Sequence, residues 1–285
     1  MKISIIVCSR TAILPQALVD NIEQTIFSSS SEHTYEIICI DNSNNQYNIF
    51  QAYNIGVARA TGDIFCFQHD DICYHSIGWG DRVIDTLTPP IGCCAVAGAT
   101  LVRKSPSWYS LPGYRVINIE QGGHTYQDTT TKVPLATFDG VWFCIRRECF
   151  HTIRFDDTSY QGFHFYDQDT ALQLHAAGYR IVSQPDVFIE HQGSQTTDKQ
   201  WLVSSYRFYD KWKHQLPLQT TATIVSTQEL RRVEMEGIYT SLRLILRYRQ
   251  FALLWKWFTM TGEVLDMNPL AAAATTLRHH WKQTK

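Results

Sequence analysis

Short apolar runs alternate with helix-like stretches through the N-terminal part of the chain, and this alternation constrains the fold more than any other feature. The apolar runs are continuous, as expected for strands that are buried on both faces of a parallel sheet. Between the first two runs, Leu18, Ile22 and Ile26 recur every four residues, which is typical of one helix face. The order strand–helix–strand–helix–strand predicts an open α/β sheet, whose ligands bind at the carboxyl ends of the strands. The expected strands are residues 3–8, 36–40 and 63–67, and the expected helices are residues 18–26 and 49–60.

The rest of the chain divides into a mixed region and a helical region. Residues 104–134 are rich in Ser, Pro, Gly, Tyr and Thr and predict a long loop. From about Trp201 the pattern becomes all-helical, with a break expected near Gly237. We therefore expect an α/β domain over residues 1–200 and a helical C-terminal extension over residues 201–285. Further strands are expected at residues 93–99, 141–145, 180–183 and 187–190, and further helices at residues 167–178 and 227–260.

The composition limits the compartment and the partners. With 44% hydrophobic and 18% charged residues, the chain has the composition of an ordinary globular protein. Its formal charge of −2 argues against a whole-protein electrostatic attraction to nucleic acid. The eight cysteines form no Cys-x-x-Cys pair and lie mostly within apolar runs, where free cysteine behaves as a small buried hydrophobe. Because no signal peptide and no run of about 18 apolar residues stands out, we expect a reducing, cytoplasmic setting.

The near-neutral total conceals a segregated charge. Residues 231–285 hold nine Lys and Arg against four Asp and Glu, whereas residues 1–230 hold 16 against 23. In the basic part, Arg243 and Arg247 lie among Leu, Trp and Phe residues. This pattern suits a helix that lies on an anionic membrane surface, which would give peripheral membrane contact through residues 239–285, although the sequence slightly favours the other interpretation. The alternative is a helix packed on the α/β domain with its arginines snorkelling to water.

An acidic cluster directly follows the third expected strand. Its sequence is Gln68-His69-Asp70-Asp71. Adjacent carboxylates repel each other, and a divalent cation relieves that repulsion. Because Mg²⁺ takes one or two protein carboxylates and completes its shell with water and phosphate oxygens, a diphosphate-bearing ligand fits this cluster. The alternative is that Asp70 and Asp71 cap a following helix or turn.

Three further segments carry candidate side chains. Asp41 follows the second strand, where its carboxylate could accept from a base or a ribose, although Asp-Asn-Ser-Asn is also a turn composition. Asp167 opens a helix and could act as a general base, while Asp169 fits the helix N-cap. His191 ends an extended piece, and a lone histidine is more often structural unless the fold brings it near Asp70.

Taken in order, these segments resemble the GT-A-type glycosyltransferases of the large family-two group over residues 3 to about 195. That family has a base-binding aspartate, an Asn-x-Gly…Ala-x-Gly helix, an acidic metal motif, an acidic base motif and a histidine. The most specific match is Phe-His-Phe-Tyr-Asp-x-Asp at residues 163–169, followed by Ala-Gly-Tyr-Arg at residues 177–180. The other matching pieces are residues 38–43, 54–64, 68–71, 139–147 and 154–156.

The resemblance implies a GT-A mixed sheet flanked by helices and a role for each matching position. It implies that Asp167 is the catalytic base and that Asp70, with Asp71 and His191, holds Mg²⁺ or Mn²⁺ on the donor diphosphate. Gln68 stands where the family has the first aspartate of Asp-x-Asp, which leaves this site less negative. The donor contacts that the resemblance implies are Ser9, Arg10, Asp41, Asn54, Arg59 and His69.

The implied function is transfer of a sugar, with inversion, from a nucleoside-diphosphate donor to a hydroxyl of a glycan or lipid-linked acceptor in bacterial polysaccharide synthesis. The resemblance favours a UDP-sugar. One base suffices for inversion, whereas a retaining double displacement needs a second, nucleophilic carboxylate. One alternative is a sugar nucleotidyltransferase, although no Gly-rich or basic triphosphate loop follows residues 3–8. The other is a weakly active or inactive glycan- or nucleotide-binding module whose Trp108, Tyr109 and Tyr114 stack on sugars.

Overall fold

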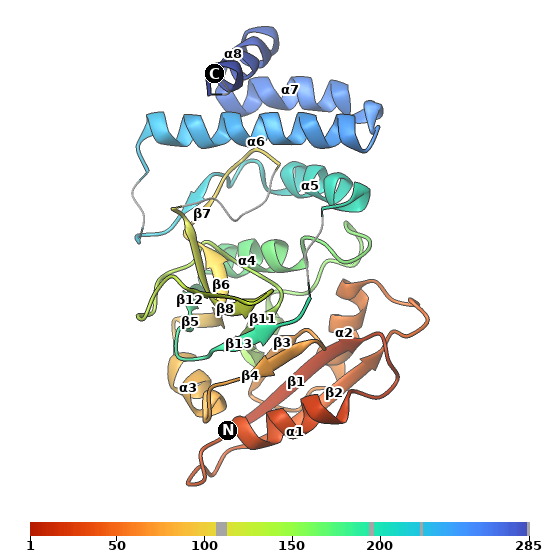
Figure 1. The fold of residues 1–285 in the computed structure, drawn as a ribbon, viewed down its shortest axis with the longest axis vertical. Helices are drawn as coiled ribbons and strands as arrows, with labels where there is room; N and C mark the ends of the chain where they lie inside the picture. The colour runs from red at the N-terminus through yellow and green to blue at the C-terminus, as the bar shows by residue number, and fades with distance from the viewer. Residues whose placement is uncertain (107–112, 194–196, 223–224, 284–285) are drawn as a thin grey trace.

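A six-stranded mixed sheet forms the centre of the N-terminal part of the chain (Figure 1). This computed structural model describes residues 1–106, 113–193, 197–222 and 225–283. The strand order is β12-β5-β11-β3-β1-β2; β1 is parallel to β2 and β3, and β11 runs antiparallel between β3 and β5. The mixed α/β sheet expected from the sequence is therefore confirmed. Its strands are β1 (Lys2–Ser9), β2 (Thr34–Asp41), β3 (Ile64–Gln68), β5 (Ile91–Ala95), β11 (Trp142–Arg146) and β12 (Arg180–Ser183).

Helices cover both faces of this sheet because its central strands are apolar on both faces. Successive side chains of a strand point to opposite faces, so Ile6 and Phe67 join one core cluster while Ile5 and Cys66 join the other. The second cluster contains Leu18 of α1. These two cores hold the sheet between helices and fix its carboxyl edge. The helices are α1 (Gln16–Thr25), α2 (Ile49–Arg59), α3 (Trp79–Thr86) and α4 (Tyr166–Ala176), with a short 3₁₀ helix at Arg147–His151.

Two strands of a second sheet lie within residues 104–134, where a long loop was expected, so that prediction is wrong. Residues 115–127 form a hairpin, because Gly122 and Gly123 take positive φ angles of 58° and 75° at its turn. The expected single strand at residues 93–99 is also wrong, since its two halves belong to different sheets. The second sheet has the order β10-β6-β8-β13-β4, with β9 paired to β8. Its strands are β4 (Ile72–Tyr74), β6 (Ala97–Ala99), β8 (Arg115–Gln121), β9 (His124–Gln127), β10 (Thr137–Phe138) and β13 (Ile189–His191).

The chain ends in a helical layer, seen at the end of the molecule opposite the N-terminus (Figure 1). The expected break near Gly237 is wrong: α6 runs through it, because a Cβ there would lie only 2.1 Å from the Oγ of Ser105 and glycine permits that approach. The chain instead turns at Arg249, whose φ is 53°. The elements are α5 (Lys199–Trp212), α6 (Thr227–Arg247), a 3₁₀ turn (Phe251–Leu253), α7 (Leu254–Leu265) and α8 (Pro269–Gln283).

The helical part packs firmly on the sheet region. Tyr206 of α5 belongs to the same buried cluster as Phe67 of β3, and the two-residue strand β14 (Leu218–Gln219) pairs with β7 (Leu101–Val102). The carboxylate of Glu234 in α6 accepts from the backbone N–H groups of Lys104 and Ser105 at 2.6 and 2.7 Å. The predicted division at residue 200 stays a prediction.

Two further sequence-based expectations concern the aromatic residues that could stack on sugars and the lack of a membrane-spanning segment. Trp108 and Tyr109 lie outside the residues that the structure describes, whereas the hydroxyl of Tyr114 donates to Glu229 at 3.1 Å. Within the described ranges, none of the helices combines the length and the apolarity that crossing a bilayer requires.

Candidate active site

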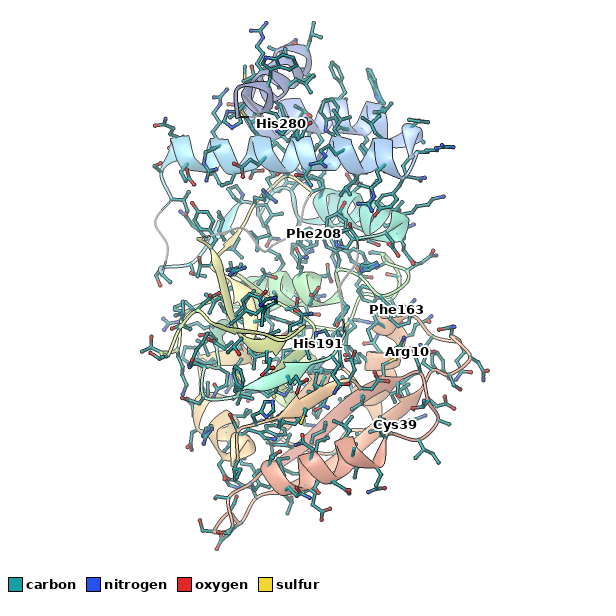
Figure 2. All side chains as sticks on the ribbon, viewed as in Figure 1. Arg10, Cys39, Phe163, His191, Phe208 and His280 are labelled. Carbon is teal, nitrogen blue, oxygen red and sulfur yellow. The ribbon has the colours of Figure 1, made fainter. Side chains whose placement is uncertain are left out.

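A cavity of about 440 Å³ lies at the carboxyl ends of β1, β2 and β3, which is the edge where an α/β sheet binds its ligands. Ser9 and Arg10 line it from the end of β1, and Asp167 lines it from the first turn of α4. Phe163, from the loop before α4, lines it as well, and Figure 2 shows Arg10 and Phe163 on the same side of the molecule. The cavity therefore gathers residues from distant parts of the chain.

Asp167 is held in the cavity by two backbone donors. The N–H of Gly140 donates to Oδ2 at 3.1 Å, and the N–H of Gln168 donates to Oδ1 at 2.8 Å. The helix begins at Tyr166, and Phe165 before it has a φ of 70°. A non-glycine residue in this left-handed region carries strain of about 1 kcal/mol or more, which functional sites often hold. The chain reverses here so that the first turn of α4 presents Asp167 to the cavity.

The surroundings of Asp167 suit a proton acceptor. Burial and the nearby charge of Asp139 raise its pKa to about 7, although the two backbone hydrogen bonds act in the opposite direction. Asp139 itself is buried, and its Oδ1 accepts from the N–H of Val141 at 2.9 Å. A carboxylate with a pKa near neutrality is matched to general base catalysis near neutral pH.

Asp169 does not cap α4, so that expectation is wrong. It lies in the helix, fully buried, and its Oδ1 accepts from Nε1 of Trp212 at 2.7 Å and from the hydroxyl of Tyr160 at 3.1 Å. Nζ of Lys211 lies 2.8 Å from the same oxygen. Because Lys211 and Trp212 belong to α5, this buried cluster anchors α4, and with it Asp167, to the C-terminal helices.

Two histidines and an aspartate converge beside the cavity. His69 and Asp71 follow β3, and His191 ends β13. Nδ1 of His69 lies 3.2 Å from Nε2 of His191, and Oδ1 of Asp71 lies 3.4 Å from the same Nε2 and 3.8 Å from Nδ1 of His69. One ligand atom from each residue falls within 4.8 Å of the others. Imidazole and carboxylate together form a donor set for Mn²⁺ and other first-row divalent cations.

The details of this cluster fit a divalent cation. Asp71 Oδ1 is buried and accepts no hydrogen bond from the described residues, although buried acceptors are normally paired. A Cβ on Gly193 would lie 2.6 Å from Oδ2 of Asp71 and 2.8 Å from Nε2 of His191, so the absence of a side chain keeps this space open. Burial lowers the pKa of His69, which favours the neutral imidazole that binds metals, and the facing His191 ring lowers the pKa of Asp71.

Asp70 has different partners from Asp71. Its Oδ2 accepts from the hydroxyl of Ser9 at 2.8 Å and from the backbone N–H of Arg10 at 3.3 Å. It lines the cavity, but its ligand atoms are not part of the His69–Asp71–His191 cluster. The metal role of Asp70 therefore stays a prediction, while its visible contacts tie the end of β1 to the end of β3.

Gln68 points into the core rather than toward the cluster. It is fully buried, its Oε1 accepts a short hydrogen bond from the hydroxyl of Tyr74, and that hydroxyl also accepts from Nε1 of Trp142 at 2.8 Å. The amide at this position is thus part of a buried polar group behind the site.

The remaining predicted donor contacts lie outside the cavity lining. Oδ1 of Asp41 accepts from the N–H of Ser43 at 2.9 Å, which lowers the pKa of Asp41. Nδ2 of Asn54 donates to the carbonyl of Phe155 at 2.8 Å, and Arg59 is exposed in the last turn of α2. The structure brings together Ser9, Arg10, His69, Asp70, Asp71 and Asp167 in the lining, and it joins His191 to them through His69 and Asp71.

Three residues at the site were not singled out from the sequence. Nε2 of Gln121 lies 3.1 Å from Nδ1 of His191 and donates to the carbonyl of Gly193 at 3.0 Å, so this amide contacts both the ring and the loop that follows it. The hydroxyl of Tyr166 lies 3.3 Å from Nε2 of His69, and Asp139 acts on Asp167 through its charge. The Gly-Gly pair after Gln121 was the available signal for the hairpin that carries this residue. Asp139 begins the matching segment 139–147, but nothing in the sequence indicated that it lies beside Asp167.

Comparison with known proteins identifies the family to which this chain belongs. The profile of the Glycosyltransferase like family matches residues 4–214, and a comparison with curated proteins finds no match. Similar solved chains include GalNAc-T7 with UDP, GalNAc and Mn²⁺ (11% identity, TM-score 0.49, covering 75% of this chain and 50% of that one). Another is the mannosyltransferase PcManGT from Pyrobaculum calidifontis with GDP-Man and Mn²⁺ (13% identity, TM-score 0.45, covering 96% and 86%). A third is the catalytic domain of Drosophila β1,4-galactosyltransferase 7 with xylobiose (14% identity, TM-score 0.42, covering 70% and 77%).

These structural similarities are weak, and this chain spans half the length of GalNAc-T7, so what those proteins bind is not carried over to it here. The family profile, in contrast, covers well over half of the chain. The matched residues include the cavity lining and His69, Asp71 and His191. The chain belongs to the Glycosyltransferase like family. Its mixed α/β architecture is the GT-A fold, as the resemblance implied.

Proposed function

We propose that this protein is a metal-dependent, inverting glycosyltransferase that transfers a sugar from a nucleoside-diphosphate donor to a hydroxyl of a glycan or lipid-linked acceptor. The observation that carries this proposal is the cavity that holds Asp167, with a pKa near 7, together with the adjoining His69–Asp71–His191 cluster. A UDP-sugar as donor, a role in bacterial polysaccharide synthesis, and a cytoplasmic location on the inner face of the membrane belong to the same proposal and rest on the sequence resemblance.

Asp167 takes the proton of the acceptor hydroxyl as that oxygen attacks the anomeric carbon of the donor. The hydrogen bonds from Gly140 and Gln168 fix the orientation of the carboxylate, and its raised pKa makes it a better base than an exposed aspartate. Among the other nearby carboxylates, Asp139 does not line the cavity, Asp70 accepts hydrogen bonds from Ser9 and Arg10, and Asp71 belongs to the histidine cluster, so we assign none of them as a covalent nucleophile. A single base without a nucleophilic partner supports one displacement with inversion.

His69, Asp71 and His191 would hold the divalent cation, which when bound stabilises the negative charge of a diphosphate leaving group. Gln121 contacts the ring of His191, and the hydroxyl of Tyr166 contacts His69. Ser9 and Arg10, which line the cavity, are proposed to contact the donor. Asp41, Asn54 and Arg59 lie outside the lining and are proposed as donor contacts on the sequence resemblance alone. These residues bind and orient the donor, whereas Asp167 moves the proton.

The test combines two variants with two measurements. Asp167→Asn is expected to retain the Mn²⁺-dependent thermal shift with UDP or a UDP-sugar and to lose transfer by about 10³-fold or more. Asp71→Asn is expected to lose the Mn²⁺-dependent shift itself, because it removes the charged ligand of the cluster. Asp157→Asn, which changes an aspartate paired with Arg154 outside the cavity, is the control and should leave both measurements unchanged.

Transfer by Asp167→Asn at the wild-type rate would exclude this residue as the base. A thermal shift with GDP-sugars but not UDP-sugars would change the assignment of the donor while keeping the mechanism. Release of pyrophosphate from a nucleoside triphosphate and a sugar phosphate, in place of sugar transfer, would identify the sugar nucleotidyltransferase alternative. Binding of sugars without transfer or donor hydrolysis would identify a binding module.

A further inference from the structure

The turn between α6 and α7 presents large apolar side chains to solvent. Leu246 is 53% exposed, Phe251 57% and Trp255 73%, and the ring of Phe258 lies 5.8 Å from that of Trp255. Exposed aromatic side chains gathered on one turn are unusual on a protein surface that faces water, and they are typical of an interaction site. We call Leu246, Phe251 and Trp255 the aromatic corner.

Basic residues predominate in the segment of chain that carries the aromatic corner. Residues 237–262 contain four basic residues, Arg243, Arg247, Arg249 and Lys256, and no aspartate or glutamate. The three arginines are exposed, and Lys256 pairs with Asp210 of α5. The corner is therefore an apolar, aromatic surface bordered by positive charge.

This combination fits an anionic lipid surface better than a second copy of the chain. Trp and Phe side chains insert at the boundary between headgroups and acyl chains, while neighbouring arginines attract anionic headgroups. In a symmetric dimer through the corner, the same patch of both copies would meet, and the arginines of one copy would face those of the other. That like-charge contact disfavours the dimer.

The corner is connected to the rim of the cavity. The hydroxyl of Tyr248, at the end of α6, donates a short hydrogen bond to the carbonyl of Thr197. The next residue, Asp198, has its Oδ1 3.3 Å from Nε2 of His164 and accepts from the N–H of Trp201 at 2.6 Å. His164 and Trp201 both line the cavity. Residues 197–201 thus contact Tyr248, which lies in the chain between Leu246 and Phe251 of the corner, and also supply Trp201 to the cavity lining.

We propose that the aromatic corner is a peripheral membrane contact that binds anionic lipid headgroups and sets the His164–Trp201 rim of the cavity close to the bilayer. The corner narrows the membrane contact expected for residues 239–285 to a defined turn. Its consequence for catalysis rests on the proposed function, because a cavity rim at the bilayer serves a lipid-linked acceptor rather than a free glycan. The binding itself does not depend on that function and is tested separately.

The test is co-sedimentation of the full-length chain with vesicles. The wild-type chain is expected to bind vesicles of phosphatidylcholine mixed with phosphatidylglycerol. Phe251→Ser combined with Trp255→Ser should reduce the partition coefficient about tenfold or more, because binding scales with the buried apolar area. Arg243→Gln and Arg247→Gln should each reduce binding to these vesicles about fivefold and leave the weak binding to pure phosphatidylcholine unchanged.

Leu270→Ser is the matched control, because Leu270 is 70% exposed in α8, away from the corner. It should bind vesicles as the wild type does. Equal loss in Leu270→Ser and in the corner variant, unchanged binding by the corner variant, or no binding by the wild type would overturn the proposal. So would a wild-type dimer that Trp255→Ser dissociates in light scattering.

The thermal shift with UDP and Mn²⁺, measured on the same variants, separates this proposal from the proposed function. A variant that keeps the thermal shift but no longer co-sediments with the vesicles has lost only the membrane contact. A wild-type chain that binds vesicles without any donor-dependent shift would contradict the proposed function alone.

Discussion

The carboxylate of Asp71 faces Nε2 of His191 at 3.4 Å because the strands beside these residues are paired. His191 stands opposite Ile72 in the antiparallel pair of β13 and β4, and the N–H of Gln192 donates to the carbonyl of Asp71 at 3.0 Å. Backbone pairing therefore sets the distance between the two side chains that we propose as ligands. Such preorganisation lowers the cost of assembling a metal site.

Gly193→Ala is expected to weaken the proposed metal site without unfolding the protein. The new methyl group would lie within 3 Å of both Asp71 Oδ2 and His191 Nε2, so one of these side chains must move. We expect the affinity for Mn²⁺ to fall about tenfold to 100-fold, measured by isothermal titration calorimetry, with a thermal unfolding midpoint close to that of the wild type. An unchanged affinity would mean that the cation binds away from this cluster.

Gln68→Asp tests whether the family's aspartate at this position would strengthen the site. The side chain is fully buried against Tyr74, so the substitution places a carboxylate in the core rather than in the cavity. We expect the free energy of unfolding in urea to fall by about 3 kcal/mol and the affinity for Mn²⁺ to stay as it is. A gain in Mn²⁺ affinity would show that residue 68 reaches the cation.

The pH dependence of transfer follows from the environment of Asp167. The base must be ionised, so kcat/KM is expected to rise as the pH passes the pKa of about 7 and to be lost below it. Asp139→Asn removes a negative charge that raises this pKa, and it leaves an oxygen to accept from Val141. The rising limb should therefore move to lower pH by about one unit. If the rising limb of the pH profile does not move in this variant, the profile reports the ionisation of a group other than Asp167.

Glu234→Gln is expected to loosen the contact between α6 and the sheet region. The buried carboxylate accepts from two backbone donors, and an amide presents an N–H₂ group to one of them. We expect the free energy of unfolding to fall by about 2–3 kcal/mol, measured by urea denaturation at pH 7. Glu236→Gln, two residues along, removes only a partly exposed ion pair with Arg232 and should cost less than about 0.5 kcal/mol. Similar losses in both variants would contradict the role given to Glu234.

Much of the fold could be predicted from the sequence, because the central strands and the first helices have regular apolar patterns. The run Ile3–Cys8 and the repeat of Leu18 and Ile22 correspond to β1 and α1. The hairpin of β8 and β9 was missed, since its residues are polar on one face and lie in a Gly- and Thr-rich stretch. The continuity of α6 through Gly237 was also missed, because the approach of Ser105 that glycine permits is a tertiary contact.

The candidate site was only partly predictable. The sequence identified the acidic cluster, Asp167 and His191 as polar groups at the ends of apolar segments, and it determined the family resemblance through their order. The sequence could not rank Asp70 against Asp71 as a ligand, since adjacent residues have nearly the same local pattern. Only the pairing of β13 with β4 directs Asp71 and His69 to His191, while Asp70 turns to Ser9 and Arg10.

The sequence by itself determined the alternation of strands and helices and the segregation of basic residues into the C-terminal part, because apolar periodicity and charge are local properties of the chain. The tertiary structure decided which side chains meet: Gln68 packs in the core, His69 lies beside Asp71 and His191, and Asp139 acts on Asp167. It also decided that Leu246, Phe251 and Trp255 stay exposed while Trp257 is buried. These outcomes depend on contacts between distant segments, and a local sequence pattern carries no information about such contacts.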